Sequence, residues 1–392
     1  MNFENTISKY PENIAIIGGG RWSKVLTEMV CRITPTKAKI SVHSNYNFDS
    51  ITEWIVKKGL SDKVKAFATW PDFSIKESCA VIIVNAARDH EKAVRWALLA
   101  GIPVLVEKPM TLSGPASQQL VELAKMHNTY LATAHIFLFA RYLHNFYNIV
   151  KEAGKISQID FFWEDPNVEN RYGEKKQYDA GLPVYADWLP HILSITSVLT
   201  PGLPQSCEKI KFSKGGADLE INLFFGDIPC VAKLVRNGNR RIRIIKVIVN
   251  GKIYELDFST EPGFIRYGNT VINGDTDWEI KERPSQLMLK AFLNAVSGLE
   301  FDNRLDASIG LRSCKVIDQV AILYNAKKLS WLREKLVSQD FVDDEIRYAL
   351  IEMIQSNHIV GSKDLEEEME KLRKEIVSSP EAILMKELKI NT

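Results

Sequence analysis

Glu107 and Lys108 place a carboxylate and an ammonium group at the end of an apolar stretch. The segment PVLVEKPMTL, 103–112, starts with residues typical of a strand buried on both faces and then changes abruptly to Glu-Lys-Pro. A proline after the lysine fixes the exit from the strand and restricts the residue before it, which suits a lysine aimed inward. The alternative is a surface ion pair between the two charged neighbours. An inward ammonium group could polarise a ligand oxygen.

The segment IAIIGGGRWSKVLTEMV, 14–30, carries a second chemical signal, a glycine turn between a β-branched strand and a helical pattern. Gly18 permits a tight turn, and Gly20 lets backbone N–H groups approach a pyrophosphate that would face the positive end of the helix. Ser23 stands where the third glycine of such a motif usually lies. Because turns favour glycine anyway, the motif alone fits nucleotide binding and a simple turn equally well.

A third signal is the absence of an acid in VHSNYN, 42–47, where a carboxylate normally accepts hydrogen bonds from the ribose of NAD. The first carboxylate that follows is Asp49. Ser44 and Asn45 could instead donate hydrogen bonds to a 2′-phosphate, which favours NADP over NAD. The alternative is a neutral loop that accepts either cofactor.

These residues need a framework that brings the ends of several strands together. Apolar segments alternate with helical patterns such as HEKAVRWALLAG and SQQLVELAKMH, which predicts a doubly wound parallel sheet. After the strand before Gly18, the expected strands lie at 40–42, 81–84, 104–106 and 130–133. Ligands of such sheets lie beyond the carboxyl ends of the strands, where Gly18, His43, Asn85 and Glu107 all fall. The charges at 107–109 therefore line a predicted crevice.

Composition limits the class of partner. The chain has 392 residues, 45% of them hydrophobic, and a formal net charge of +1, so a sizeable core is expected and neither nucleic acid nor a membrane surface is favoured. The five cysteines are scattered singly, which predicts reduced thiols in a cytoplasm and no metal site. No run of about 18 apolar residues occurs, and residues 1–12 do not resemble a signal peptide. A small-molecule substrate is the expected partner.

Three segments together resemble the glucose-fructose oxidoreductase / inositol dehydrogenase family, called Gfo/Idh/MocA. They are GGGRWSK, then AVIIVNAARDHEKAVRWALLAGIPVLVEKP, and later DWLPH, and the resemblance runs from about Ile14 to Leu323. It implies an N-terminal Rossmann domain and a second α+β domain with an open, mainly antiparallel sheet. That sheet often serves as a subunit interface, so a homodimer or homotetramer is expected. The resemblance also assigns Lys108, Asp187 and His191 to the catalytic site.

Elementary chemistry is consistent with those three assignments. Hydride transfer to or from a carbonyl or alcohol requires exchange of a proton, and an imidazole titrates near neutrality, so His191 suits the proton and Lys108 the oxygen. Asp187 could orient His191 from four residues earlier on one side of a first helical turn, with Pro190 tolerated there. DWLPH alone fits an ordinary histidine on an amphipathic helix better; the Glu-Lys-Pro segment reverses that preference. A cis Lys108–Pro109 peptide is also expected from the resemblance.

The remaining site residues are expected around the cofactor and the substrate. The expected cofactor-binding residues are Gly18, Gly20, Arg21, Trp22, Ser44, Asn45, Asn85, His90, Glu107 and Lys108. The expected substrate-binding residues are His135, Arg171, Lys176 and Tyr178. For His90 the alternative is a residue that only starts a helix, and for His135 it is a packed interdomain histidine. The loop that carries the last three, 163–188, would otherwise be a solvated connection, and its GLPVYA departs from the glycine-rich run usual in the family.

We predict three domains: a dinucleotide-binding Rossmann domain at 1–135, a substrate-binding and oligomerisation domain at 136–329, and a helical C-terminal extension at 330–392. Strand patterns dominate 156–280, and Asn250-Gly251 predicts a tight hairpin. The extension has two amphipathic stripes, and Ser379-Pro380 resembles a further helix start. The apolar residues of the stripes are Ile346, Ala349, Leu350, Met353 and Ile354, then Leu365, Met369, Leu372 and Ile376. The extension packs on its own domain or dimer mate, or docks a carrier protein.

The resemblance implies an NAD(P)-dependent oxidoreductase acting on a sugar, sugar nucleotide or cyclitol, and the scattered cysteines favour the cytoplasm. One alternative is an imine reductase of the same family, similar to thiazolinyl imine reductases, acting on a carrier-bound intermediate. The other is a nucleotide-binding regulator without turnover, which would have no need of a proton relay through Lys108, Asp187 and His191.

Overall fold

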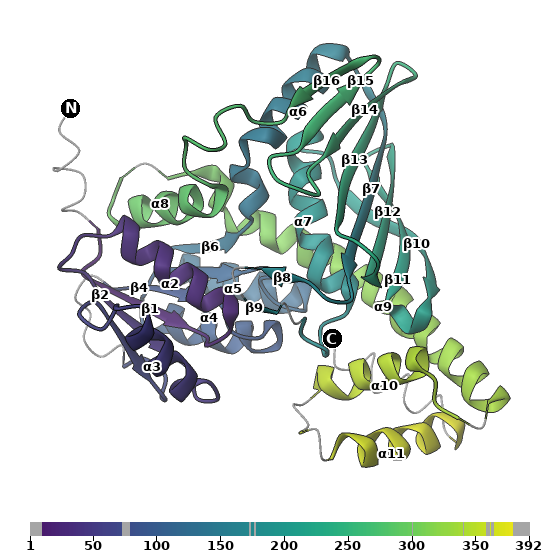
Figure 1. Cartoon of the computed structure of the whole chain (residues 1–392), viewed down its shortest axis with the longest axis horizontal. Helices are drawn as coiled ribbons and strands as arrows, with labels where there is room; N and C mark the ends of the chain where they lie inside the picture. The colour runs from purple at the N-terminus through teal and green to yellow at the C-terminus, as the bar shows by residue number, and fades with distance from the viewer. Residues whose placement is uncertain are drawn as a thin grey trace. The chain divides into compact units, whose positions relative to one another are not determined.

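The computed structural model in Figure 1 describes residues 10–72, 79–171, 174–175, 178–299, 301–339, 341–357, 361 and 364–378. Its contacts divide the chain into two compact units, Met1–Phe139 with Glu282–Cys314 and Ala140–Lys281 with Lys315–Thr392. The return of 282–314 to the first unit was not predicted, because an amphipathic pattern does not reveal which core a helix covers. The domain boundaries at 135 and 329 stay predictions.

The described strands of the first unit form a parallel sheet of six strands in the order β3-β2-β1-β4-β5-β6. The strands are β1 (Asn13–Ile17), β2 (Lys39–His43), β3 (Val64–Phe67), β4 (Cys79–Ile83), β5 (Val104–Glu107) and β6 (Leu131–Ala134). The order reverses direction between β1 and β4, and ligands of such sheets bind beyond the carboxyl ends of the two strands at that point. The predicted doubly wound parallel sheet is confirmed.

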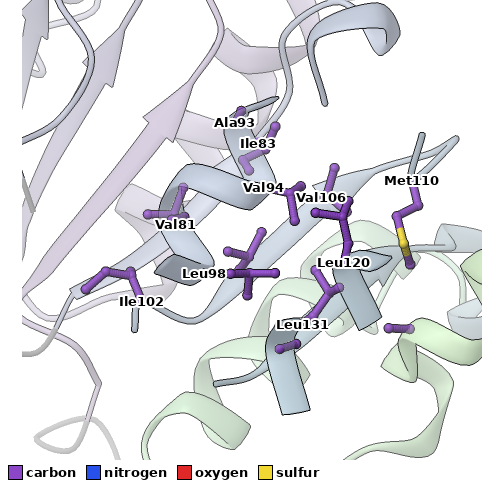
Figure 2. Close-up of a cluster of buried hydrophobic side chains, with 14 of the residues drawn as sticks. Val81, Ile83, Ala93, Val94, Leu98, Ile102, Val106, Met110, Leu120 and Leu131 are labelled. Carbon is purple, nitrogen blue, oxygen red and sulfur yellow. The ribbon is translucent and has the colours of Figure 1, made fainter. Parts of the chain in front are cut away.

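Helices follow the strands and cover the sheet. They are α2 (Arg21–Ile33), α3 (Phe48–Lys57), α4 (His90–Leu99), α5 (Gly114–Met126), α8 (Pro284–Val296) and the 3₁₀ turns η1 (Ala87–Asp89), η2 (Ile136–Phe139) and η4 (Asn303–Leu305). Figure 2 shows the core between β4, β5 and two of these helices, where Val81 and Val106 face Val94 and Leu98 of α4 and Leu120 of α5. All five side chains are fully buried. Packing of the helices on these strands therefore holds the end of β5, which carries Glu107, in place.

The second unit is built on a mixed sheet in the order β10-β11-β12-β7-β13-β14-β15-β16. The strands are β7 (Ile156–Pro166), β10 (Gln205–Ser213), β11 (Asp218–Phe225), β12 (Ile228–Gly238), β13 (Ile242–Val249), β14 (Lys252–Asp257), β15 (Phe264–Tyr267) and β16 (Thr270–Asn273), with a separate pair β8 (Asn170–Arg171) and β9 (Glu174–Lys175). Only β7 and β12 pair in parallel among these described strands, so the predicted mainly antiparallel sheet is confirmed. The predicted hairpin lies between β13 and β14, where Asn250 and Gly251 have φ of 50° and 72°.

Two helices, α6 (Arg141–Ala153) and α7 (Val184–Leu199), pack on this sheet, α6 against β13 and β14 and α7 against β11 and β12 (Figure 1). α7 is buried along most of its length, since its apolar residues lie all round the helix. A 3₁₀ turn, η3 (Lys214–Gly216), joins β10 to β11. Helix α7 is thus held rigidly, which matters because it carries Asp187 and His191.

Three helices end the described part of the chain: α9 (Ala307–Ser338), α10 (Asp344–Asn357) and α11 (Leu365–Ser378). The end of α9 packs with α10 and α11 around a core of their own, and both predicted stripes face it. The stripe residues Ile346, Ala349, Leu350, Met353, Ile354, Met369 and Ile376 are buried. The predicted helix start at Ser379-Pro380 lies outside the described residues. No helix in the described part of the chain has both the length and the apolar character needed to cross a bilayer.

Candidate active site

The glycine turn of the first unit is shaped by close backbone contacts. Gly18 has φ of 138°, and a Cβ added there would lie 2.6 Å from the Val84 carbonyl oxygen at the end of β4. The Gly18 N–H donates to the His43 carbonyl at the end of β2 (2.9 Å), and the buried Ser23 hydroxyl donates back to the Gly18 carbonyl (2.7 Å). Ser23, in the place of the third glycine, thus fastens the turn that it follows.

Gly20 differs from Gly18 in having open space around it. It is the N-cap residue of α2 with φ of −79°, it provides no side-chain cap, and a Cβ added there would meet no atom within 4 Å. The first N–H groups of α2 therefore face an uncrowded position at the positive end of the helix dipole. This cradle fits the pyrophosphate of a dinucleotide, so Gly18, Gly20, Arg21 and Trp22 would hold that part of the cofactor.

These two glycines give a matched pair of predictions. We expect Gly18→Ala to lower the free energy of unfolding by about 2 kcal/mol or more, because it combines a strained φ with a backbone clash. We expect Gly20→Ala to fold like the wild type and to bind NADPH more weakly, because its methyl group occupies the cradle. Urea denaturation and fluorescence titration with NADPH check both outcomes. Equal stability of the two variants would contradict this account of the turn.

The end of β2 places Ser44 beside the glycine turn. The Ser44 N–H donates to the Phe67 carbonyl (2.9 Å), its hydroxyl accepts from the Asn47 N–H (3.2 Å), and a Cβ on Gly19 would lie 2.3 Å from that hydroxyl oxygen. Asn45 next to it is exposed. The loop therefore presents neutral hydrogen-bonding groups next to the cradle.

The Glu-Lys-Pro turn at the end of β5 is joined to α2 by a hydrogen bond. The Trp22 indole Nε1 donates to Glu107 Oε1 (2.6 Å), and Glu107 Oε2 accepts from the Lys108 backbone N–H (3.2 Å). The predicted cis Lys108–Pro109 peptide is present, and the Lys108 side chain is half-buried. Glu107 is thus a link between the glycine turn and the lysine turn, which keeps two predicted cofactor-binding segments adjacent.

His90 contacts the backbone of the Glu-Lys-Pro turn. Its Nδ1 lies 2.7 Å from the Pro109 carbonyl oxygen and its Nε2 lies 3.2 Å from that of Asn85, and the residue is fully buried. Burial lowers the pKa of His90, although both carbonyls oppose this, so the ring is neutral at pH 7. The shorter distance favours an Nδ1–H that donates to Pro109. His90 thus positions the chain at Pro109, while its predicted contact with the cofactor stays a prediction.

His135 follows β6 and is almost completely buried in the first unit. Burial, with smaller contributions from the positive charges of Lys108 and Arg312, lowers the pKa of His135 to about 3. Neither ring nitrogen makes a hydrogen bond within the described residues. A buried neutral imidazole of this kind is costly without a partner, so a water molecule or a ligand group would stabilise it. This supports a binding role more than simple packing.

The second unit holds Asp187 and His191 on α7, but the helix begins earlier than predicted. It starts at Val184, after Pro183 as N-cap, so Pro190 lies inside the helix and not in its first turn. The expectation that Pro190 lies in the first turn was therefore wrong. The helix includes Val184, Tyr185 and Ala186 before Asp187, and Pro183 is the extended residue that precedes it. Asp187 lies near the N-terminal end, where the helix dipole stabilises a carboxylate.

Arg236 at the end of β12 holds Asp187, and sequence analysis did not identify it. Its Nη2 donates to Asp187 Oδ2 (3.2 Å), and only 3% of the arginine side chain is exposed. On the neighbouring strands, Arg243 pairs with Asp165 and lies between two tryptophan rings, 4.7 Å from Trp163 and 5.1 Å from Trp188. The Trp163 ring is in turn 5.8 Å from the His191 ring. The one available signal was a cluster of arginines in strands that otherwise read as apolar.

Of the predicted substrate-binding residues in the second unit, Tyr178 joins this cluster. Its ring covers the Arg236 guanidinium group, with 4.5 Å between the guanidinium carbon and the ring centroid, and it remains 40% exposed. Arg171 ends β8, and its side chain lies outside the described structure, as does Lys176. Lys108 and His135 belong to the first unit and Asp187 and His191 to the second, so the meeting of these side chains stays a prediction.

Comparison with known proteins identifies the first unit. Residues 13–135 match the family model described as an oxidoreductase family with an NAD-binding Rossmann fold. Over these residues the chain resembles the Gfo/Idh/MocA oxidoreductases. It carries the nucleotide-binding domain of an NAD(P)-dependent oxidoreductase. No curated protein sequence matches the chain.

Solved structures with the same fold cover both units. One is a UDP-N-acetylglucosamine 3-dehydrogenase from Acidithiobacillus ferrooxidans, with 18% identity and a TM-score of 0.63 over 80% of this chain and 97% of that one. Another is a 3-ketoreductase from Actinomadura kijaniata in complex with TDP-benzene and NADP, with 14% identity and a TM-score of 0.63 over 79% and 96%. A third is a biliverdin reductase from Synechocystis in complex with biliverdin and NADP⁺, with 16% identity and a TM-score of 0.61 over 79% and 98%. At these identities the likeness establishes the fold.

Proposed function

We propose that this chain transfers a hydride between NAD(P) and a carbonyl or alcohol carbon of a sugar, sugar nucleotide or cyclitol, with Lys108 acting on the oxygen and His191 on the proton. The observation that carries the proposal is the Trp22–Glu107 hydrogen bond, which keeps the lysine turn adjacent to the dinucleotide cradle. A lysine at that edge of a parallel sheet lies where a substrate would meet the cofactor. Two of the similar structures come from proteins named for dehydrogenation or reduction at position 3 of their substrates.

The chemistry divides among the chain's own residues. When bound, the nicotinamide ring supplies or accepts the hydride. The Lys108 ammonium group stabilises negative charge that develops on the substrate oxygen, and the His191 imidazole gives or takes the proton. Asp187, held by Arg236, orients the imidazole and stabilises its protonated form.

The substrate-binding role of His135, Tyr178, Arg171 and Lys176 belongs to this proposal. His135 offers two unsatisfied ring nitrogens, and Tyr178 offers a phenol whose oxygen lies 3.5 Å from Asn237 Nδ2. Such groups are suited to hydroxyl-rich ligands, since each sugar hydroxyl both donates and accepts. Among the described residues no group of His, Cys, Asp and Glu side chains could hold a metal ion.

The test is turnover measured at 340 nm. The purified protein is incubated with NADP⁺ or NAD⁺ and UDP-N-acetylglucosamine, inositol or glucose, and with NADPH or NADH and the corresponding ketones. An increase or decrease in the absorbance of the reduced cofactor that requires both substrate and protein supports the proposal. Reduction of cyclic imines, with no reaction of any ketone, would favour the imine reductase alternative. Tight cofactor binding without any turnover would favour the regulator.

The cofactor preference gives a separate prediction. We expect NADPH to bind more tightly than NADH, because Ser44 and Asn45 replace the usual carboxylate. In Ser44→Asp, a negative charge would face the 2′-phosphate, so the affinity for NADPH should fall about tenfold or more, while that for NADH rises. Titration of tryptophan fluorescence with each cofactor measures both. A wild type that prefers NADH would contradict the assignment.

A homodimer or homotetramer through the second sheet, in the cytoplasm, is part of the same proposal. Ile253, Phe264 and Val271 of β14, β15 and β16 are about half exposed or more, at 57%, 49% and 60%. An open sheet with apolar residues near its edge suits a subunit interface. A carrier protein remains the partner expected for the imine reductase alternative.

A further inference from the structure

Helix α10 directs two polar side chains into the second unit. Tyr348 and Glu352 are four residues apart, so they share one face of the helix. Only 1% of Glu352 is exposed. Buried acids are rare unless they are paired, so this face does more than complete an apolar core.

One oxygen of the Glu352 carboxylate is held by α9, while its Oε2 makes no hydrogen bond among the described residues. Its Oε1 accepts from Lys328 Nζ (3.0 Å) and from the Tyr324 hydroxyl (2.8 Å), and both of these residues are buried. Gly216 of η3 makes room for the phenol, since a Cβ there would lie 2.0 Å from the Tyr324 oxygen. The neighbouring Gly215 gives the same close approach to α10, because its Cβ would lie 2.2 Å from the Glu345 carbonyl oxygen. The extension is therefore fitted to this unit through specific positions.

Tyr348 connects the extension to Arg236. Arg236 Nη1 donates to the Tyr348 hydroxyl (3.2 Å) and to the Leu182 carbonyl (2.9 Å), and Nη2 donates to Asp187. Burial alone would lower the pKa of Arg236, but Tyr348, Asp187 and Glu352 raise it above its ordinary value. Burial raises the pKa of Tyr348, so the phenol keeps its proton while it accepts from the guanidinium group. Three acceptors thus hold the Arg236 guanidinium group, and one of them, Tyr348, comes from the extension.

We propose that α10 is a working part of the candidate active site, with Tyr348 as a positioning residue that orients Asp187 through Arg236. This rests on the proposed function, because it assumes that Asp187 supports a catalytic His191. The family resemblance ends near Leu323, so the contact is a feature of this chain's extension. The hydrogen bonds form one continuous path: Tyr348 to Arg236, and Arg236 to Asp187 on the helix that carries His191.

Packing alone does not account for this arrangement. The extension already has an apolar core of its own between α9, α10 and α11. Apolar residues at the contact would attach the extension without desolvating an arginine, a lysine and a glutamate. Replacing buried charged groups by apolar ones often raises the free energy of unfolding. Hydrogen-bonded polar groups between α10 and the sheet instead require one relative orientation. Here they lead from Tyr348 through Arg236 to Asp187. Because the guanidinium group is planar and rigid, its contact with Tyr348 through Nη1 also sets the direction of Nη2 toward Asp187.

The test uses Tyr348→Phe in the full-length protein, with Arg347→Gln as the matched control. Phenylalanine keeps the ring and removes the acceptor. Arg347 is the preceding residue of the same helix and pairs with Glu366 at the surface. With ¹⁵N-arginine and ¹³C-histidine labels, we expect resolved Arg236 Nη signals in the wild type, assigned with Arg236→Lys. In Tyr348→Phe these signals should broaden and the His191 ring signal should shift, whereas the control should match the wild type.

A second measurement separates this inference from the proposed function. With any substrate that the wild type turns over, Tyr348→Phe should lower kcat about tenfold, since a hydrogen bond to a charged group is lost, and leave the KM for NADPH close to the control. The melting temperature should fall modestly, because a buried N–H group of Arg236 loses its acceptor. Absence of turnover in the wild type would count against the proposed function only, because the NMR signals need no substrate. If the Arg236 and His191 signals are the same in Tyr348→Phe and in the wild type, the positioning role is wrong.

Discussion

Replacing Lys108 with methionine is expected to lower kcat by about a hundred- to a thousandfold while NADPH still binds. Methionine has a similar length and apolar stem but no charge, so it removes the group that stabilises developing negative charge on the substrate oxygen, and groups of this kind contribute on that scale. The dinucleotide cradle at Gly18 and Gly20 does not depend on the ammonium group. Turnover at 340 nm and fluorescence titration with NADPH measure the two effects separately.

The matched control is Lys125→Met, which makes the same chemical change at an exposed position on α5 of the same unit. It should leave both turnover and cofactor binding as in the wild type. Lys108→Arg is a useful third variant, because it keeps the charge but spreads it over a wider group, and partial activity is expected. Full turnover by Lys108→Met would remove the lysine from the mechanism, whatever the cofactor binding showed.

The first unit could be predicted well because its signals are local. Five of the six described strands of the parallel sheet are short, largely buried apolar runs, so β1, β2, β4, β5 and β6 were recognised within a residue or two. β3, with the sequence VKAF, was missed because it lies at the edge of the sheet, where Lys65 and Phe67 are exposed and the apolar signal is weak. The strand ends then follow from the fold, and with them the positions of Gly18, Ser44 and Glu107.

The contacts of the second unit could not be predicted in the same way. Alternation along β12 and β13 indicates which residues face inward, but it does not indicate which partner a buried arginine finds. Arg236 meets Asp187 from a strand some fifty residues later in the chain, and Tyr348 arrives from more than a hundred residues later still. Charge partners at such separations depend on how helices and sheet pack, which periodicity does not encode.

The start of α7 shows how a single proline can mislead. Pro190 suggested a helix beginning near Asp187, because proline is best tolerated in the first turn. Pro183 and the apolar VYA before Asp187 were the better signal, and the helix starts at Val184. An interior proline is retained where packing outweighs the lost hydrogen bond, and Pro190 is buried among the apolar residues of that helix.

Glu352→Gln is expected to lower the free energy of unfolding by about 3 kcal/mol. The substitution keeps the size of the side chain and an oxygen that can accept from Tyr324, but it leaves the buried Lys328 ammonium group without its counter-charge, and breaking a buried pair from one side costs about that much. Urea denaturation followed by circular dichroism gives the value. Glu366→Gln, which removes the exposed partner of Arg347 in the same extension, should change little.

The double variant Lys328→Met/Glu352→Gln decides between two explanations of that loss. If an uncompensated charge is responsible, removing the lysine as well should restore most of the stability, because no buried ammonium group remains and Tyr324 keeps its acceptor. If the carboxylate instead matters through its charge on Arg236, the double variant should be at least as unstable as the single one. Recovery would also show that the pair is dispensable for folding, which leaves orientation of the helix face carrying Tyr348 as the reason for burying it.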